Sequence, residues 1–220
     1  MCGRYALFHE PVELAREFGT VNAFPERARY NLPPGEYHPV VRQEANGERF
    51  VLAARWGLLP SWVRDPRAVA HPINAKSETA ATKPMFRQAL RRARVLVPAS
   101  GWYEWRSENG LKQPYYFARV DGHPLAFAGL LEHWSGFDGE AVTYAILTTA
   151  ANTALAAIHD RMPVVLERAD QARWLDPEMT DPRKLEDLLV PAAENTLQFH
   201  RVGRRVNRPV EDDPGLILAE

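Results

Sequence analysis

Cysteine is almost absent from this 220-residue sequence, which contains only one, Cys2, directly behind Met1. A single cysteine excludes an internal disulfide and any zinc site built from several cysteines. Because a small second residue permits removal of the initiator methionine, we expect the mature chain to begin with Cys2. It would then carry an α-amine and a thiol on adjacent carbons. The thiol is either an inert core group or a reactive one, and its position favours the reactive role.

Long apolar runs and an excess of charge of either sign are also missing. No stretch approaches the roughly 18 apolar residues of a membrane span, and the first residues lack the basic and apolar regions of a secretion signal. We therefore expect a cytoplasmic protein that does not bind membranes. The 27 Lys and Arg residues are balanced by 28 Asp and Glu residues, so the net charge of −1 does not itself indicate a nucleic-acid partner.

Local clusters of arginine are more informative than the net charge. The segment PMFRQALRRAR places Arg87, Arg91 and Arg94 at helical spacing. The tail HRVGRRVNR adds four more arginines: Arg201, Arg204, Arg205 and Arg208. Two interpretations remain open, a solvated helix face with a basic tail, or a basic groove on an otherwise neutral body.

Internal repeats are absent as well, and 45% hydrophobic residues in 220 positions are enough to bury one substantial core. We expect a single domain over residues 1–220. Strands are predicted at 94–99, 101–105, 114–120, 124–134, 141–149 and 196–202, with a hairpin around Asn46-Gly47. Short helices are predicted at 12–19, 77–82, 84–94, 152–158, 167–175 and 182–189. The predicted fold class is α+β, with a mainly antiparallel, barrel-like β core and short surrounding helices, and segment 61–75 is predicted to be a functional loop.

Four short stretches hold polar groups where a core would not favour them: MCGR, INAKSET, GWYEW and HDRMPVV. In GWYEW, Glu104 is flanked by large aromatic residues, and desolvation there would raise its pKa towards neutrality; the alternative is a surface carboxylate. His159 lies at an element boundary, where an imidazole can face a cleft or be merely structural. Asn74 is either a site residue or a helix N-cap, a role for which Ser77 competes.

These stretches, in this order, resemble the SRAP family, the SOS response-associated peptidase or abasic-site processing proteins. The resemblance covers nearly the whole chain, through MCGRYA, YNLPPGE, WGLLPSW, INAKSETAATKPMF, GWYEW, KQPYYFA, ILTTAAN, HDRMPVVL and RVN. It implies a protein that recognises abasic sites in single-stranded DNA and attaches to them covalently. The implied active residues are Cys2, Asn74, Glu104 and His159. The implied DNA contacts are Arg4, Trp62, Lys76, Phe86, Trp105 and Arg161, with Lys76 where the family more often has arginine.

The chemistry of an amino-terminal cysteine gives this resemblance a physical reason. The ring-opened form of an abasic deoxyribose is an aldehyde, which an amine attacks to give a Schiff base. An α-amine, with a pKa of about 7.7–8.0, keeps a useful neutral fraction at physiological pH, whereas lysine does not. The thiol can then close a five-membered thiazolidine, which an internal cysteine could not form.

The remaining roles follow as hypotheses from the same reaction. Glu104 would relay protons, His159 would help to open the sugar ring, and Asn74 would orient the terminal amine. No metal or cofactor is needed for these steps. We expect a monomer whose partner is single-stranded DNA with abasic sites, and which associates with the nucleoid when bound to DNA.

Two alternative functions belong to different classes. Glutamine amidotransferases of the N-terminal nucleophile hydrolase class also begin Met-Cys-Gly, but they usually continue into an apolar strand, which Arg4 interrupts here. The second alternative is a module that binds single-stranded DNA without covalent chemistry.

Overall fold

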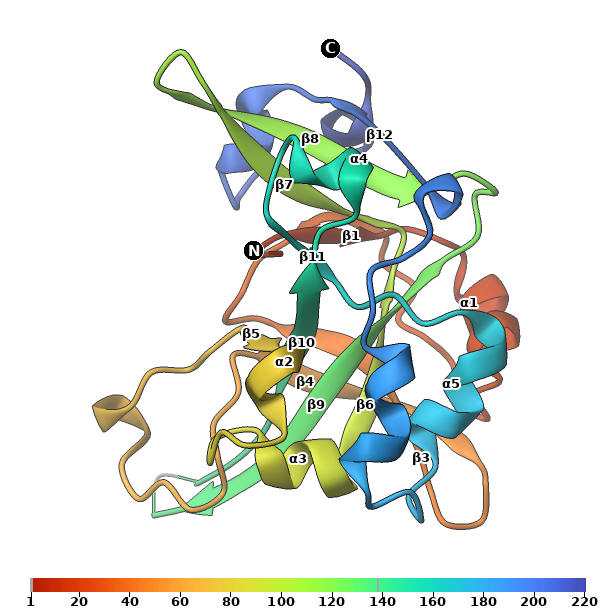
Figure 1. Cartoon of the computed structure of the whole chain (residues 1–220), viewed down its shortest axis with the longest axis vertical. Helices are drawn as coiled ribbons and strands as arrows, with labels where there is room; N and C mark the ends of the chain where they lie inside the picture. Colours follow the sequence, from red (N-terminus) through yellow and green to blue (C-terminus); the bar gives the residue numbers. More distant parts are fainter. Residues whose placement is uncertain (1, 138) are drawn as a thin grey trace.

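Two β-sheets form the centre of the molecule, for which a computed structural model describes residues 2–137 and 139–220 (Figure 1). The first sheet has the strand order β12-β8-β7-β1-β2. Its strands are β1 (Tyr5–Leu7), β2 (Arg29–Leu32), β7 (Gly101–Glu108), β8 (Leu111–Arg119) and β12 (Leu197–Arg201). Every pairing in this sheet is antiparallel.

The second sheet closes on itself. It contains β3 (Tyr37–Gln43), β4 (Arg49–Trp56), β5 (Asn74–Lys76), β6 (Arg94–Ala99), β9 (Leu125–Gly136), β10 (Gly139–Ala150) and β11 (Arg161–Pro163). The pairings run from β10 to β4, β3, β6 and β9, and β9 pairs again with β10. Only the pairings of β10 with β4 and β5 are parallel among the described strands. The predicted α+β class with a mainly antiparallel, barrel-like core is therefore confirmed.

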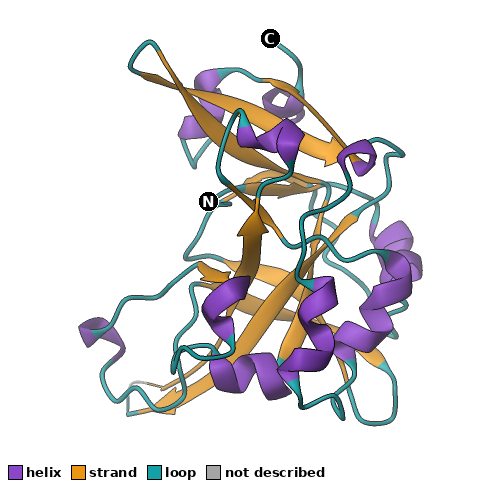
Figure 2. Ribbon diagram, viewed as in Figure 1, coloured by secondary structure: helices purple, strands orange, loops and turns teal. Residues whose placement is uncertain are grey.

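Short helices lie around the outside of the strands (Figure 2). They are α1 (Pro11–Phe18), α2 (Ser77–Ala80), α3 (Arg87–Arg92), α4 (Thr153–Ala156) and α5 (Arg168–Leu175). Five 3₁₀ turns are also described: η1 (Pro66–Ala68), η2 (Pro182–Leu188), η3 (Glu194–Thr196), η4 (Arg204–Asn207) and η5 (Pro214–Ile217). Helix α1 buries Leu14 and Phe18 and ends at Gly19, whose φ of 65° is the left-handed conformation that glycine adopts without strain.

Three predicted segments differ from the structure. The helix predicted at 84–94 is only Arg87–Arg92, because Arg94 begins β6 and its guanidinium is buried. That group donates hydrogen bonds to backbone carbonyls of α3 and of the end of α5, so it is a structural residue and not part of an exposed basic face. The segment 61–75, predicted to be a loop throughout, ends in β5, and 182–189 is a 3₁₀ turn in place of an α-helix.

The basic tail is largely neutralised by nearby carboxylates. Arg205 pairs with Glu211 and Asp213. Arg208 also pairs with Glu211, at 3.1 Å, and Arg201 contacts Glu108 at 3.3 Å. The tail therefore does not supply a row of unpaired cations, and the interpretation of a solvated tail fits it better than that of a basic groove.

The first half of β7, in the first sheet, is buried on both faces. Alternation along β7 sends Trp102 into the main core and Tyr103 into a second apolar cluster, which also contains Tyr116, Val206 and Leu216. The main core fills the space between the first sheet and the barrel, where the Tyr5 and Tyr144 hydroxyls lie 2.9 Å apart. A polar residue on the Trp102 side of β7 therefore faces a dry interior.

Candidate active site

Cys2 lies three residues before the start of β1 and is completely buried. The side-chain amide of Asn74 donates to the backbone oxygen of Cys2 over 2.8 Å. Asn74 is held in place because β5 pairs with β10, with Asn74 opposite Ile146. Asn74 is therefore a residue of this site and not a helix cap. Ser77 does not cap α2 either, since the N-cap position is Lys76 and carries no side-chain bond.

Glu104 faces the same interior as Cys2. It lies on β7, on the Trp102 side of the strand, and is only 1% exposed. Burial raises the pKa of Glu104 to about 7. Burial also raises the pKa of the Cys2 thiol, and the nearby charge of Glu104 adds to that effect. At neutral pH the thiol thus stays protonated, while the carboxyl group can both accept and release a proton.

The raised pKa of Glu104 predicts how stability depends on pH. Folded protein holds this proton more tightly than the unfolded chain, whose carboxyl titrates near 4.3, so the contribution of Glu104 to stability is lost as pH rises towards 7. Glu104→Gln cannot ionise and escapes this loss. Relative to the wild type, the free energy of unfolding of this variant should rise by about 2 kcal/mol between pH 5 and pH 8. Urea denaturation at both pH values measures the difference in free energy of unfolding between the two proteins. A difference that is the same at both pH values would contradict the prediction.

His159 lies between α4 and β11, at the element boundary that the sequence predicts. Its Nδ1 accepts a hydrogen bond from the backbone N–H of Arg161 at 3.0 Å, and an oxygen of Asp160 also lies 3.0 Å from it. Burial lowers the pKa of His159, so the neutral imidazole is favoured, with its proton on Nε2. On protonation, Nδ1–H could donate to Asp160 instead. The ring is thus placed to gain and lose a proton.

Arg161 is a largely buried cation near this site. Its side chain is 12% exposed and forms two parallel bonds to the carboxylate of Glu78, with Nη···Oε distances of 2.5 and 2.8 Å. The same guanidinium donates to the backbone oxygen of Thr148 at 2.6 Å. This ion pair lowers the pKa of Glu78, so the carboxylate is charged at neutral pH.

Three of the predicted DNA contacts line one groove, together with Asn74. The groove has a volume of about 490 Å³, and its walls include Trp62, Lys76 and Phe86. Trp62 is 61% exposed, which is high for an indole, whereas Phe86, the N-cap residue of α3, is buried. Aromatic faces beside lysines form the kind of surface on which unpaired bases stack.

Arg4 and Trp105 lie apart from that groove, around η4. Arg4 donates to the side-chain oxygen of Asn31 at 2.8 Å and to the backbone oxygen of Val206 at 3.2 Å. Trp105 donates from its indole N–H to the side chain of Asn207 at 2.7 Å. Both residues are neighbours of the site in sequence, Arg4 two positions after Cys2 and Trp105 directly after Glu104.

Comparison with known proteins assigns the family. The sequence model of the SOS response associated peptidase (SRAP) family matches residues 1–209. The chain belongs to this family. The abasic site processing protein YoqW of Bacillus subtilis (strain 168) is 36% identical to this SRAP chain over 231 residues, covering 99% of each. The abasic site processing protein YedK of Escherichia coli (strain K12) is 34% identical over 181 residues, which cover 81% of this chain and 78% of YedK.

Solved structures agree with the fold of the SRAP chain. A crystal structure of a protein from Bacteroides thetaiotaomicron matches with a TM-score of 0.88 over 100% of both chains. Its sequence identity of 24% supports the fold alone. Within residues 2–137 and 139–220, no cluster of three or more His, Cys, Asp and Glu residues could hold a metal ion. In the same part of the SRAP chain, no helix has the length and apolar character needed to cross a membrane.

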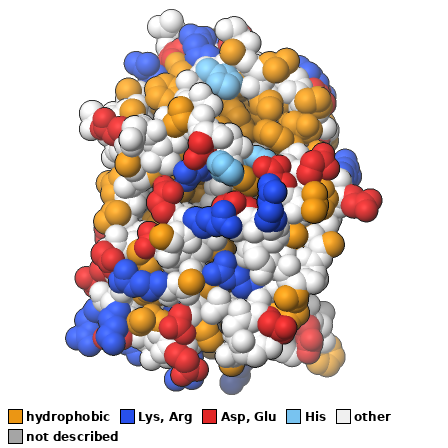
Figure 3. All heavy atoms as spheres, turned by 90° about the vertical axis from the view of Figure 1, so that its right-hand side faces the viewer, with side chains coloured by type: hydrophobic (Ala, Val, Ile, Leu, Met, Phe, Trp, Pro, Cys, Tyr) orange, Lys and Arg blue, Asp and Glu red, His pale blue; other side chains and the backbone are white. Residues whose placement is uncertain are grey.

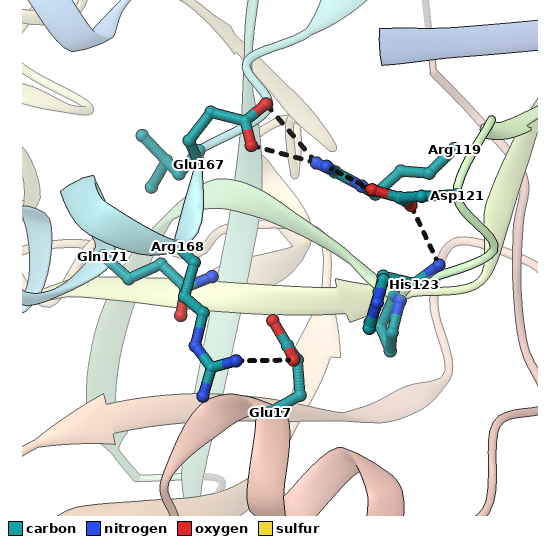
Figure 4. A pocket seen from close by; sticks show the side chains of 9 residues that line it. Glu17, Arg119, Asp121, His123, Glu167, Arg168 and Gln171 are labelled. Atoms are coloured by element: carbon teal, nitrogen blue, oxygen red, sulfur yellow. Dashed lines mark hydrogen bonds and ion pairs between the residues drawn. The ribbon is translucent and has the colours of Figure 1, made fainter.

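A second hollow, on another face of the SRAP chain, has a structural explanation. The face that carries α1 and α5 is turned to the viewer in Figure 3, where acidic and basic side chains lie beside one another. Arg119 lies there between Glu167 and Asp121, and Arg168 reaches Glu17 (Figure 4). The hollow is about 140 Å³, and the donors of Arg119 are engaged with carboxylates. These pairs join α5 to α1 and to the β8–β9 turn.

Sequence reasoning missed two residues near the active site, Glu78 and Thr148. Glu78 stands inside the INAKSET stretch, but its partner Arg161 is 83 positions away, so no local pattern indicates the ion pair. Thr148 contributes its backbone oxygen, a role that any residue type could fill. The sequence therefore indicates several residues of the site, but not the contacts between residues that are far apart in the chain.

Proposed function

We propose that this SRAP chain recognises abasic sites in single-stranded DNA and becomes covalently attached to them through a thiazolidine at Cys2. The observation that carries the proposal is the surroundings of Cys2, which is bonded to Asn74 and close to a buried Glu104 whose pKa is about 7. The names of the related abasic site processing proteins support the substrate. The mechanism also requires removal of Met1, which lies outside the described residues.

The reaction needs one aldehyde, one amine and one thiol. The α-amine of Cys2 attacks the aldehyde carbon of the opened sugar and gives a carbinolamine, which loses water to form an imine. The thiol sulfur then adds to the imine carbon, and the thiol proton ends on the nitrogen. The product ring contains that carbon, the nitrogen, Cα, Cβ and the sulfur, and water is the other product.

Each of the neighbouring side chains has a role in this sequence. The side-chain oxygen of Asn74 is buried and has no hydrogen-bond partner within the described part of the chain, so it can accept a bond from the terminal amine. Glu104 takes the proton of the buried thiol and returns protons to the carbinolamine, because its pKa of about 7 lets it act in both directions. His159, neutral and able to hold a proton, assists opening of the sugar ring.

The groove beside Asn74 supports binding of an unpaired strand. Trp62 offers an exposed aromatic surface for stacking, Phe86 supplies part of the apolar wall of the groove, and Lys76 offers a charge for a phosphate. We further propose that Arg4, Trp105 and Arg161 extend this contact on the other sides of Cys2. Such a surface binds the strand without reading its sequence, which suits a protein that must accept a lesion in any context.

A denaturing gel tests the proposal. Purified protein incubated with a single-stranded oligonucleotide that carries one abasic site should give a band shift that survives heating and disappears after protease treatment. The same oligonucleotide with an intact base should give no such band. Binding on a native gel without a covalent band would favour the noncovalent module. Release of ammonia from glutamine, with no covalent band, would favour the amidotransferase alternative.

A further inference from the structure

Strand β10 organises the site, because it lies between the two segments that carry Asn74 and Arg161. β5 pairs with β10 in parallel at Ile146–Thr148, and β11 pairs with it antiparallel at Thr148–Ala150. Thr148 is opposite Lys76 on one side and Pro163 on the other. Both flanking strands are only three residues long, so few backbone bonds fix their position.

A side-chain bridge crosses β10 at this point. Arg161, on β11, reaches over the backbone oxygen of Thr148 and forms its two parallel bonds with Glu78, at the start of α2. Glu78 follows β5 by two residues, so a short stretch of backbone links it to Asn74. The backbone N–H of Arg161 donates a hydrogen bond to Nδ1 of His159. The bridge therefore connects the segment that holds Cys2 to the segment that holds the imidazole.

We propose that Glu78 is a positioning residue, which acts through Arg161 to fix Asn74 and His159 relative to each other across β10. The inference rests on the proposed function, since Asn74 and His159 are its proposed active residues. Parallel bonds between a guanidinium and a carboxylate fix orientation as well as distance. A misplacement of about 1 Å at a reacting group can cost about 100-fold in rate, so the bridge acts on the chemical step.

A direct phosphate contact alone does not account for this arrangement. The fork of Arg161 that would bind a phosphate with two bonds is already occupied by Glu78, and the side chain is only 12% exposed. A negative charge beside a DNA site also weakens binding of the strand. If the only effect of Glu78 were its charge, loss of that charge would improve DNA binding and leave the crosslinking rate unchanged. Positioning predicts a slower reaction instead.

Two substitutions separate these roles. Glu78→Gln removes the charge but keeps the shape, and Arg161→Lys keeps the charge but loses the two-bond geometry. Both should lower the crosslinking rate at saturating DNA by about tenfold or more. For Glu78→Gln, which is assigned no contact with DNA, the concentration of DNA needed for half-saturation should change less than threefold or fall. An unchanged saturating rate in either variant, or a loss confined to affinity, would overturn the proposal.

Glu167→Gln is the matched control, because Glu167 is as exposed as Glu78, at 50%, and also meets an arginine, Arg119, away from the site. This control should crosslink at the wild-type rate. Hydrogen exchange, measured without DNA, provides a readout that does not depend on the reaction. The amide of Arg161 should exchange faster in Glu78→Gln than in wild type, but not in the control. Equal exchange would refute the bridge even if the wild type forms no crosslink, whereas absence of crosslinking alone refutes only the proposed function.

Discussion

A residue retained in front of Cys2 should abolish the heat-stable adduct with abasic single-stranded DNA. The ring requires a free α-amine and a thiol on adjacent carbons, and an added residue converts that amine into an amide, which is not nucleophilic. A bulky residue inserted between Met1 and Cys2 serves this purpose, because it also prevents removal of the methionine. Intact-mass spectrometry confirms the two amino termini, and a denaturing gel measures the adduct.

Cys2→Ser separates the two nucleophiles. This variant keeps a small second residue and hence a free α-amine, so it should still form an imine that borohydride traps. Without the thiol it should form no stable ring, and its adduct should be lost on heating unless it has been reduced. Crosslinking by the extended protein at the normal rate, or equal heat stability of the unreduced Cys2→Ser adduct, would eliminate the thiazolidine mechanism.

The strands that the sequence predicted correctly are those whose signals are local. Segment 94–99 forms β6 with the predicted bounds, and the Asn46-Gly47 signal marks the β3–β4 hairpin, where Gly47 has a φ of 86°. These segments have apolar runs or turn residues that specify their conformation independently of the rest of the chain. The β9–β10 pairing that closes the barrel also joins two long strands with strong local signals.

The short strands were missed because their conformation depends on partners distant in sequence. β5 is extended because it pairs with β10, some 72 positions later, and nothing in Asn74–Lys76 itself favours a strand. Arg94 was assigned to a helix face by its spacing, yet four backbone carbonyls around it satisfy a buried guanidinium. Periodicity cannot show that a charged side chain is satisfied internally.

In the candidate site, too, local features were predictable from the sequence, whereas contacts between distant residues were not. Glu104 was predicted to have a raised pKa because aromatic neighbours flank it, and its burial on β7 bears this out. The contact of Asn74 with Cys2 joins residues 72 positions apart, and only the resemblance to the SRAP family grouped them in advance. The roles of Arg4, Trp62 and Trp105 in binding DNA stay predictions.

Glu104→Gln and His159→Ala should slow crosslinking by about 10²–10⁴-fold each, the usual cost of removing a general acid or base. Their affinities for single-stranded DNA should change little, because neither side chain is assigned to a phosphate or a base. Single-turnover rates at saturating DNA measure the chemical step, and affinities for a single strand without the lesion measure binding alone. Thermal denaturation of each variant shows whether the fold is retained.

The pH profile distinguishes proton transfer by Glu104 from mere packing. In the wild type the rate should rise with pH through about 7, where the buried carboxyl of Glu104 ionises, and rise further as the α-amine loses its proton near 7.7–8.0. Burial keeps the His159 pKa below its ordinary value, so the imidazole adds no further rise above pH 7. Glu104→Gln should lose the step near 7 and keep only the dependence on the amine. Wild-type rates for both variants over pH 6–8 would mean that neither residue carries protons, whereas a slow Glu104→Gln with an unchanged pH profile would assign Glu104 to holding Cys2 in place.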